Sequence, residues 1–344
     1  MNIKDMLYNL VSVYSPSGRE DEISKLIRDY LIDLDFEDPI IDRAKNVVSD
    51  NGSGKSILLC GHEDTVPGYI NPAINGDYIY GRGAVDAKAS LLALMLGAHK
   101  AMKDGFNKRI LFVAAAGEES TSKGINEIIK NYKKTDYAIF GEPGNYNNIT
   151  CGYRGRVLIK ISMSSETHHA SASNLYDNPV SYLIDVWNKI KELYGNSEFE
   201  KVSAAITKFS GGKYHNVTPE NAYMYLDIRY PASESEEFLD NIYKLAGKAS
   251  VKVISRVPPY ISNFKSDLIT SFKAAISKYS KPGLIIKSGT GDMNILGSKW
   301  NIPCITYGPG DTKLSHTSNE VINVNEIEKS IEIIARAIQH LASL

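Results

Sequence analysis

The sequence predicts a two-domain protein in which a small α+β domain is inserted into an α/β domain. The 344 residues are enough for about two domains of ordinary size. Short apolar segments alternate with helical patterns in the first and last parts of the chain, which is typical of an α/β domain. The middle of the chain instead follows the order βαββαβ, the pattern of a ferredoxin-like sandwich.

The N-terminal part combines amphipathic helices with short buried strands. Residues 19–34 repeat apolar side chains at helical spacing, and Ser17-Gly18 suits the start of that helix. A second helix is predicted over 89–103 and ends at Gly105. Buried strands are predicted at 56–60, 109–116 and 136–140. Apolar strands separated by helices indicate a sheet that is covered on both faces.

The inserted unit has the size of a small domain. Its predicted elements are strand 155–163, helix 178–194, strands 201–208 and 222–230, helix 234–247 and strand 251–256. The α/β pattern returns after Pro258-Pro259, with helix 265–279, strands 283–287 and 303–306, and a final helix 325–342.

Composition excludes several classes of protein. The chain is 43% hydrophobic and 23% charged, as in ordinary soluble proteins. A net charge of -1 argues against a nucleic-acid-binding protein. No apolar run approaches the roughly 20 residues of a membrane span, and the N-terminus does not read as a signal peptide. The three cysteines are odd in number and far apart, so we expect a reduced, cytoplasmic protein.

The strongest chemical signal follows the strand at 56–60. His62 leaves this strand, and Asp64 lies two residues later on the same side. Asp64 can therefore accept the second ring N–H of His62 and orient the ring as a metal ligand. The alternative is a turn histidine beside a capping aspartate.

Carboxylates follow the next elements. Asp86 precedes the helix at 89–103, where the commoner role of an aspartate is capping. Glu118 and Glu119 follow the strand at 109–116. Adjacent side chains in an extended segment point to opposite sides, so one can bind a metal while the other faces the substrate water.

Two further residues stand at the ends of later elements. Glu142 follows the strand at 136–140, and His316 lies in the segment HTSNE. Together with His62, Asp86 and Glu119 they form a set of two histidines and three carboxylates. Such a set suits a pair of zinc-like ions with one bridging carboxylate.

These motifs resemble those of the zinc-dependent aminoacylase and carboxypeptidase family that includes succinyl-diaminopimelate desuccinylase and acetylornithine deacetylase. The resemblance spans almost the whole chain in the order of the family. The matching segments are HEDTVPG, GRGAVDAKAS, AAGEES, GEP, HHAS, NVTPENAYMYLDIR and HTSNE. It implies a mixed-sheet di-metal hydrolase domain, residues 1–153 and 259–344, with an inserted lid and dimerisation domain, residues 154–258.

The resemblance also implies roles for the clustered residues. His62 and His316 would each bind one of two divalent ions, zinc or cobalt, and Asp86 would bridge the two ions. The peptide bond between Asp86 and Ala87 is expected to be cis. Glu119 and Glu142 would complete the ligand set. Glu118 would be the general base, with Asp64 supporting His62.

The lid contributes residues that face the substrate. His169 best matches the family histidine that stabilises the oxyanion, although His168 beside it stays an alternative. Asn216 and Arg229 match an asparagine and a carboxylate-binding arginine, and a guanidinium suits bidentate contact with a carboxylate. Gly289 and Thr290 lie in a glycine-rich stretch that we expect to be a substrate-binding loop.

Within the family, the short chain and the form HEDTVPG look most like the hydrolases of carrier-protein amino-acid biosynthesis. Those enzymes release lysine or ornithine from the terminal glutamate side chain of a small acidic amino-group carrier protein, in lysine and arginine biosynthesis. The alternatives are a deacylase of N-acetylornithine or N-succinyl-diaminopimelate, a metallo-dipeptidase or carboxypeptidase, and a non-catalytic metal-binding protein. A homodimer formed through the lid is expected, with no nucleic acid or membrane partner.

Overall fold

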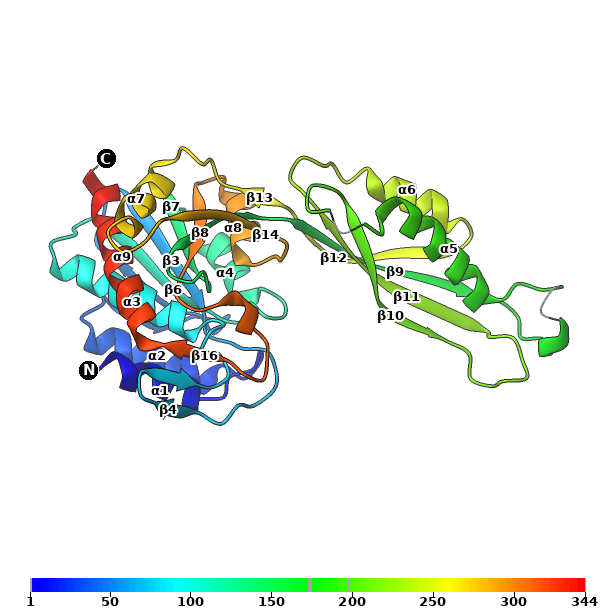
Figure 1. Cartoon of the computed structure of the whole chain (residues 1–344), viewed down its shortest axis with the longest axis horizontal. Coiled ribbons are helices and arrows are strands. Elements are labelled where there is room, and N and C mark those ends of the chain that lie inside the picture. Colours follow the sequence, from blue (N-terminus) through cyan, green and yellow to red (C-terminus); the bar gives the residue numbers. More distant parts are fainter. Residues whose placement is uncertain (1, 173–174, 197, 344) are drawn as a thin grey trace. The chain divides into compact units, whose positions relative to one another are not determined.

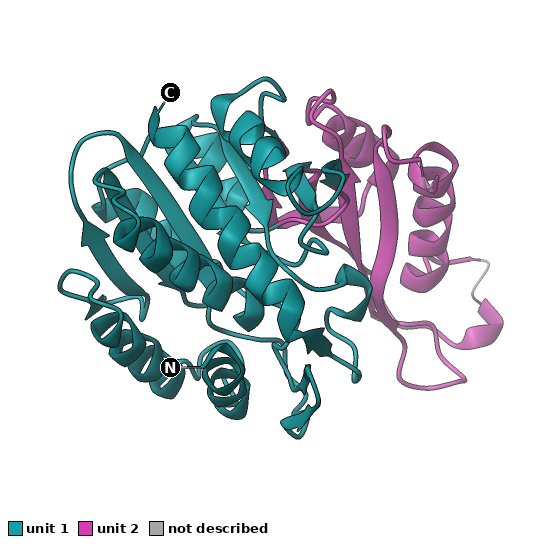
Figure 2. Ribbon diagram, turned by 60° about the vertical axis from the view of Figure 1, so that its left-hand side comes forward, with its two compact units in different colours: residues 1–152, 261–286, 291–344 teal, residues 153–260, 287–290 magenta. Residues whose placement is uncertain are grey.

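The computed structural model describes residues 2–172, 175–196 and 198–343, which form two units. The first unit contains residues 1–152, 261–286 and 291–344, and the second contains residues 153–260 and 287–290 (Figure 2). The predicted boundaries were 153/154 and 258/259, so they differ by one or two residues. Residues 287–290 join the second unit because the carbonyls of Lys287 and Ser288 accept hydrogen bonds from Arg154 and Arg229.

A nine-stranded mixed sheet organises the first unit (Figure 1). Four neighbouring strands at its centre, β6, β3, β7 and β15, run parallel. Antiparallel β2 lies beside β6, and β8 lies beside β15. The strands are β1 (Ile40–Ile41), β2 (Val47–Asn51), β3 (Ser56–His62), β6 (Arg109–Ala115), β7 (Tyr137–Gly141), β8 (Asn148–Tyr153), β13 (Tyr260–Ile261), β14 (Gly283–Lys287) and β15 (Cys304–Tyr307).

Helices cover both faces of this sheet. One face packs on the larger core cluster, and α8 contacts β7 and β15 while α4 packs on α8. Successive side chains of a strand point to opposite faces of the sheet, so both faces are buried. In β3, Ile57 and Leu59 belong to the larger cluster, while Leu58 and Cys60 are buried outside it. The helices are α1 (Ile3–Ser12), α2 (Asp21–Asp33), α3 (Lys88–Lys103), α4 (Lys123–Asn131), α7 (Asp267–Ile276), α8 (Asp292–Trp300) and α9 (Val324–Ser343).

Helix α3 is buried over most of its length. Its apolar residues surround the whole helix, as expected of a helix in a core. It packs on α1, on α9 and on β3. The sequence reading missed α1, α4 and α8, which are only nine or ten residues long. It also missed the short sheet of β4 (Ala73–Asn75), β5 (Tyr78–Tyr80) and β16 (Val321–Asn323).

The second unit has the predicted βαββαβ order. Its antiparallel sheet has the strand order β10-β11-β9-β12. Its own apolar cluster lies between this sheet and the two helices, which lie on one side of the sheet (Figure 1). The elements are β9 (Gly155–Ser164), α5 (Pro179–Tyr194), β10 (Ser203–Gly211), β11 (Asn221–Tyr230), α6 (Phe238–Ala246) and β12 (Ser250–Val257).

The three cysteines, Cys60, Cys151 and Cys304, are buried. Within the described residues, none of the helices combines the length and the apolar character that crossing a membrane requires.

Candidate metal centre

The first unit gathers its candidate ligands at the carboxyl ends of its central parallel strands. His62 is the last residue of β3, while Glu118 and Glu119 follow β6 and Glu142 follows β7. His316 lies beyond β15. Since these strands are parallel neighbours, their carboxyl ends meet at one edge of the sheet, where open α/β folds bind ligands.

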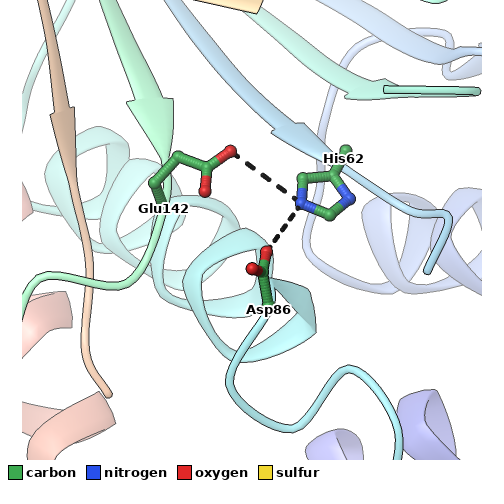
Figure 3. A group of neighbouring side chains, drawn as sticks. All are labelled: His62, Asp86 and Glu142. Carbon is green, nitrogen blue, oxygen red and sulfur yellow. Dashed lines mark hydrogen bonds and ion pairs between the residues drawn. The ribbon is translucent and has the colours of Figure 1, made fainter. Parts of the chain in front are cut away.

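Asp86 joins two groups of ligands. Its Oδ1 lies 3.2 Å from Nε2 of His62, and its Oδ2 lies 3.4 Å from Nε2 of His316. Glu142 completes the first group, with its Oε1 3.8 Å from Nε2 of His62 (Figure 3). Glu119 completes the second, with its Oε1 2.8 Å from Nε2 of His316. Each group can therefore hold one ion, and the carboxylate of Asp86 is placed to reach both.

The tautomer of His62 suits metal binding. Its Nδ1 lies 2.8 Å from the backbone carbonyl of Asp64, which can only accept a hydrogen bond. Nδ1 therefore carries a hydrogen, so that loss of the proton on Nε2 would leave the Nε2 lone pair facing Asp86 and Glu142. The expected partner was the side chain of Asp64, but its Oδ1 is 3.7 Å away.

The carboxylate of Asp64 has a different task. It accepts the backbone N–H groups of Glu118 and Glu119, at 3.0 and 3.2 Å, and the hydroxyl of Ser17 at 2.6 Å. The preceding residue, Gly117, has φ +73°, a conformation that favours glycine. This turn and Asp64 together hold the two adjacent glutamates at the end of β6.

Electrostatics shows that the cluster favours positive charge. Burial lowers the pKa of His62, but its hydrogen bond with Asp86 and the nearby charges of Glu142 and Glu118 outweigh burial and hold the pKa well above its ordinary value. Hydrogen bonds with Asp86 and Glu119 raise the pKa of His316 to about 10. The cluster thus holds protons where divalent cations would replace them, so the residues present fit a pair of ions.

Glu118 lies beside these ligands, and its surroundings favour its protonated form. Burial raises its pKa well above the ordinary value for glutamate, and the charges of Asp292 and Glu142 add to this shift while His62 opposes it. A carboxylate with a raised pKa suits general base catalysis near neutral pH.

Two residues that the sequence reading did not single out hold the loop of Asp86. Glu320 is buried and accepts the backbone N–H groups of Gly83, Val85 and Asp86, at 3.0, 3.1 and 3.2 Å. It also pairs with Arg82. Arg82 lies in the motif GRGAVDAKAS and Glu320 in the motif HTSNE, so these motifs were the sequence signal that could have identified them.

Arg82 extends this network to the loop of His316, because its Nη1 donates to the carbonyl of Thr317 at 2.9 Å. His316 has φ +63°, which is uncommon for a residue other than glycine. The peptide bond from Asp86 to Ala87 is cis, as the resemblance implied. Lys88 is no partner of the ligand cluster, since it donates to the carbonyls of Leu10 and Val13 near the end of α1.

In the second unit, the two candidate histidines have different surroundings. The backbone N–H of Ser171 lies 3.2 Å from Nδ1 of His169, so Nδ1 accepts and a neutral ring carries its hydrogen on Nε2. The ring of His168 instead stacks on that of Tyr176, with the centroids 3.5 Å apart. The structure thus leaves Nε2 of His169 as the ring nitrogen that carries the hydrogen in the neutral form.

Arg229 is held by a neighbouring acid. Its Nε lies 2.6 Å from Oδ1 of Asp227, and its Nη1 donates to the carbonyl of Ser288 at 3.4 Å. Gly289 and Thr290 follow Ser288 within the second unit. Asn216 accepts the backbone N–H of Ala170 with its carbonyl at 3.0 Å, next to the histidine pair.

Comparison with known proteins decides the family. The model of peptidase family M20/M25/M40 matches residues 58–340. The chain belongs to this family. It is therefore a hydrolase of the M20 type, and its clustered ligands provide places for metal ions.

Curated relatives and solved structures agree with this assignment. The chain is 35% identical over 98% of its length, and 95% of the relative, to a protein of Sulfurisphaera tokodaii named [LysW]-lysine/[LysW]-ornithine hydrolase. It is 33% identical, with the same coverage, to the protein of that name from Saccharolobus solfataricus. Its fold resembles a tripeptidase from Staphylococcus aureus, with TM-score 0.87, 22% identity and coverage of 99% and 98%. It also resembles a dinuclear metal-binding M20 peptidase from Bacillus subtilis, with TM-score 0.78, 14% identity and coverage of 99% and 98%.

Proposed function

We propose that the chain hydrolyses the amide bond that joins lysine or ornithine to the terminal glutamate side chain of an acidic amino-group carrier protein. The observation that carries the proposal is the position of Glu118 beside two ligand groups that share Asp86. The substrate comes from the relatives, which are named for this reaction and match 98% of the chain.

Five side chains would hold two divalent ions. They are His62, Asp86, Glu119, Glu142 and His316, a set of nitrogen and oxygen donors that suits zinc or cobalt. When bound, such ions polarise an amide carbonyl and lower the pKa of water.

Glu118 takes a proton from the attacking water as the C–O bond forms. It then returns this proton to the amine as the C–N bond breaks, so that the products are the free amino acid and the glutamate carboxylate of the carrier. His169 stabilises the oxyanion through Nε2–H, and one well-placed donor of this kind supplies roughly 3–4 kcal/mol.

Substrate recognition is assigned to the second unit. Arg229, fixed through Nε by Asp227, receives the α-carboxylate of the amino acid that is released. Asn216, Gly289 and Thr290 line the substrate according to the motifs of the family. The second unit also provides the dimer contact, for which its edge strands β10 and β12 are available. On this proposal the protein acts in lysine and arginine biosynthesis, in the cytoplasm.

The test measures amine release by metal-loaded protein. One reaction contains lysine or ornithine linked to the terminal glutamate of the carrier, and another contains N-acetylornithine and N-succinyl-diaminopimelate. We expect rapid release from the carrier alone. Rapid release from the free small molecules instead would make the chain a deacylase, and release from neither would contradict a hydrolase of this class.

The metal and the oligomeric state need separate measurements. Elemental analysis of the purified protein should give about two equivalents of zinc or cobalt per chain. Analytical ultracentrifugation should give the mass of a dimer, and a monomer at working concentrations would contradict the proposed dimer.

A further inference from the structure

The sheet of the second unit has one face that none of its described helices covers. Residues such as Val157, Ile159 and Ile161 point toward α5 and α6 and are fully buried. The residues between them point to the other side of the sheet and are partly exposed. We call this second side the open face. On its four described strands, the charged residues are Arg156, Lys160, Lys208, Asp227, Arg229 and Lys252.

The register of the strands lines up three lysines across this open face. Lys208 of β10 pairs with Tyr225 of β11, and Tyr225 pairs with Lys160 of β9. Lys160 in turn pairs with Lys252 of β12. These four residues form one row across all four strands, which we call the lysine row. Since neighbouring strands are about 4.8 Å apart, the row is roughly 14 Å long.

No acid neutralises the lysine row within the described residues. The one aspartate of the open face, Asp227, is already shared by Arg156 and Arg229, at 2.7 and 2.6 Å. Lys160 and Lys208 instead lie over the ring of Tyr223, 4.6 and 5.6 Å from its centroid. Hydrogen bonds with Ser210 and Lys208, and the charges of Lys208 and Lys160, lower the pKa of Tyr223. The open face therefore carries a surplus of positive charge.

This arrangement opposes the stability of the sheet. Lys160 and Lys252 are directly opposite each other on antiparallel strands, where like charges are destabilising. The chain as a whole has a net charge of only -1, whereas the open face carries five cationic side chains and one aspartate on its described strands. A concentrated, uncompensated row of this kind suits an anionic partner.

We propose that the lysine row and Tyr223 form a docking surface for an acidic polypeptide, namely the folded part of the carrier protein whose terminal glutamate is hydrolysed. This inference rests on the proposed function, which supplies a macromolecular substrate. A surface of lysines and tyrosines with a net positive charge complements a carboxylate-rich protein surface, and tyrosine is enriched at protein interfaces. The surface lies entirely within the second unit.

The experiment separates docking from chemistry by using two substrates with the same scissile amide. One is the carrier loaded with lysine, and the other is the γ-glutamyl amide of lysine alone. The test variant is K160A/K208A/K252A. The matched control is K189A/K191A/K244A, which removes three exposed lysines from α5 and α6.

We expect the KM for the loaded carrier to rise roughly tenfold in the test variant, with kcat within about twofold of the wild type. Hydrolysis of the small amide should stay unchanged, which also shows that the variant is folded. For the wild type, kcat/KM with the carrier should fall as salt rises from about 50 to about 500 mM, and the test variant should lose this dependence. The control variant should behave as the wild type.

Different results identify different failures. If the wild type does not hydrolyse the loaded carrier, the proposed function is wrong. If it does, and the test variant has an unchanged KM, the docking surface is wrong. Salt-sensitive binding of single-stranded RNA that requires the lysine row would assign the open face to nucleic acid and overturn the proposal. Loss of dimerisation in the test variant would likewise assign it to a second copy of the chain.

Discussion

Asp86 is the side chain on which the geometry of the metal centre depends. Its two oxygens face two histidines that come from different parts of the chain, Oδ1 toward His62 and Oδ2 toward His316. The backbone around Asp86 is in turn held by Glu320 and Arg82. At the scale of single residues, the site is therefore a set of ligands together with the buried carboxylates that hold their loops.

Replacing Glu118 by glutamine should separate catalysis from metal binding. We expect Glu118→Gln to lower kcat by about 10²–10⁴-fold, because the amide cannot accept the proton of the attacking water. Metal content and unfolding temperature should not change. The matched control is Glu63→Gln, since Glu63 is buried nearby and its carboxyl accepts the hydroxyl of Ser24. Near-normal turnover by Glu118→Gln would show that another group is the base.

Removing Glu320 should weaken metal binding without removing a ligand. Glu320→Ala leaves three backbone N–H groups without their acceptor and Arg82 without its ion-pair partner, so the loop of Asp86 loses its support. We expect the affinity for Co²⁺ to fall about 10–100-fold, as for other residues that orient metal ligands. The measurement is a Co²⁺ titration followed by absorption.

Two comparisons make the Glu320 result specific. Glu328→Ala, an exposed change on α9, should leave Co²⁺ affinity unchanged. The double variant Arg82→Ala/Glu320→Ala should lose less affinity than the sum of the single variants, because the two residues act as a pair. Wild-type affinity in Glu320→Ala would show that the loop holds Asp86 without this carboxylate.

At the scale of elements, the contact between α3 and α9 supports the loop of Asp86, because α3 begins two residues after it. The two helices approach closely at Gly97. A Cβ atom there would lie 2.6 Å from Cγ2 and 2.8 Å from Cβ of Ile334. The absence of a side chain at Gly97 is therefore a packing requirement.

Gly97→Ala should lower stability. In an unobstructed helix the same change stabilises by about 0.5–1 kcal/mol. Here the added methyl group overpacks the contact with Ile334, and we expect a net loss of about 1–3 kcal/mol in the free energy of unfolding. Urea denaturation measures this change, and Gly97→Ala/Ile334→Ala should lose less than the sum of the two single variants. An increase in stability would show that α9 moves away at little cost.

The elements that the sequence predicted share a clear physical signal. Helix 89–103 is apolar on all sides and strand 56–60 is continuously apolar, and both were found within about two residues of their predicted limits. Helices α1, α4 and α8 were not predicted, although α6 and α7, which are equally short, were.

At the scale of the whole molecule, the two units have separate apolar clusters. The candidate metal ligands belong to the first unit. Metal removal should therefore act on one unit only.

We expect chelation by EDTA to lower the unfolding temperature of the first unit and to leave that of the second unchanged. Loss of a ligand held at 1,000 times its Kd costs about 4 kcal/mol. Differential scanning calorimetry measures both transitions, and Leu226→Ala identifies the second unit because Leu226 is fully buried in its cluster. An equal shift of both transitions would mean that the units unfold together.

The sequence by itself determined the βαββαβ insertion and singled out the side chains that the structure brings together as candidate metal ligands, because apolar periodicity and chemically distinctive side chains are local properties. It did not determine which atoms of these residues meet. The carboxylate of Asp64 was expected on His62, but the backbone carbonyl of Asp64 takes that place, and the carboxylate accepts the backbone N–H groups of Glu118 and Glu119. Strand register decided the lysine row as well. Residues 160, 208 and 252 are far apart in sequence, and only the pairing of four strands brings their charges together.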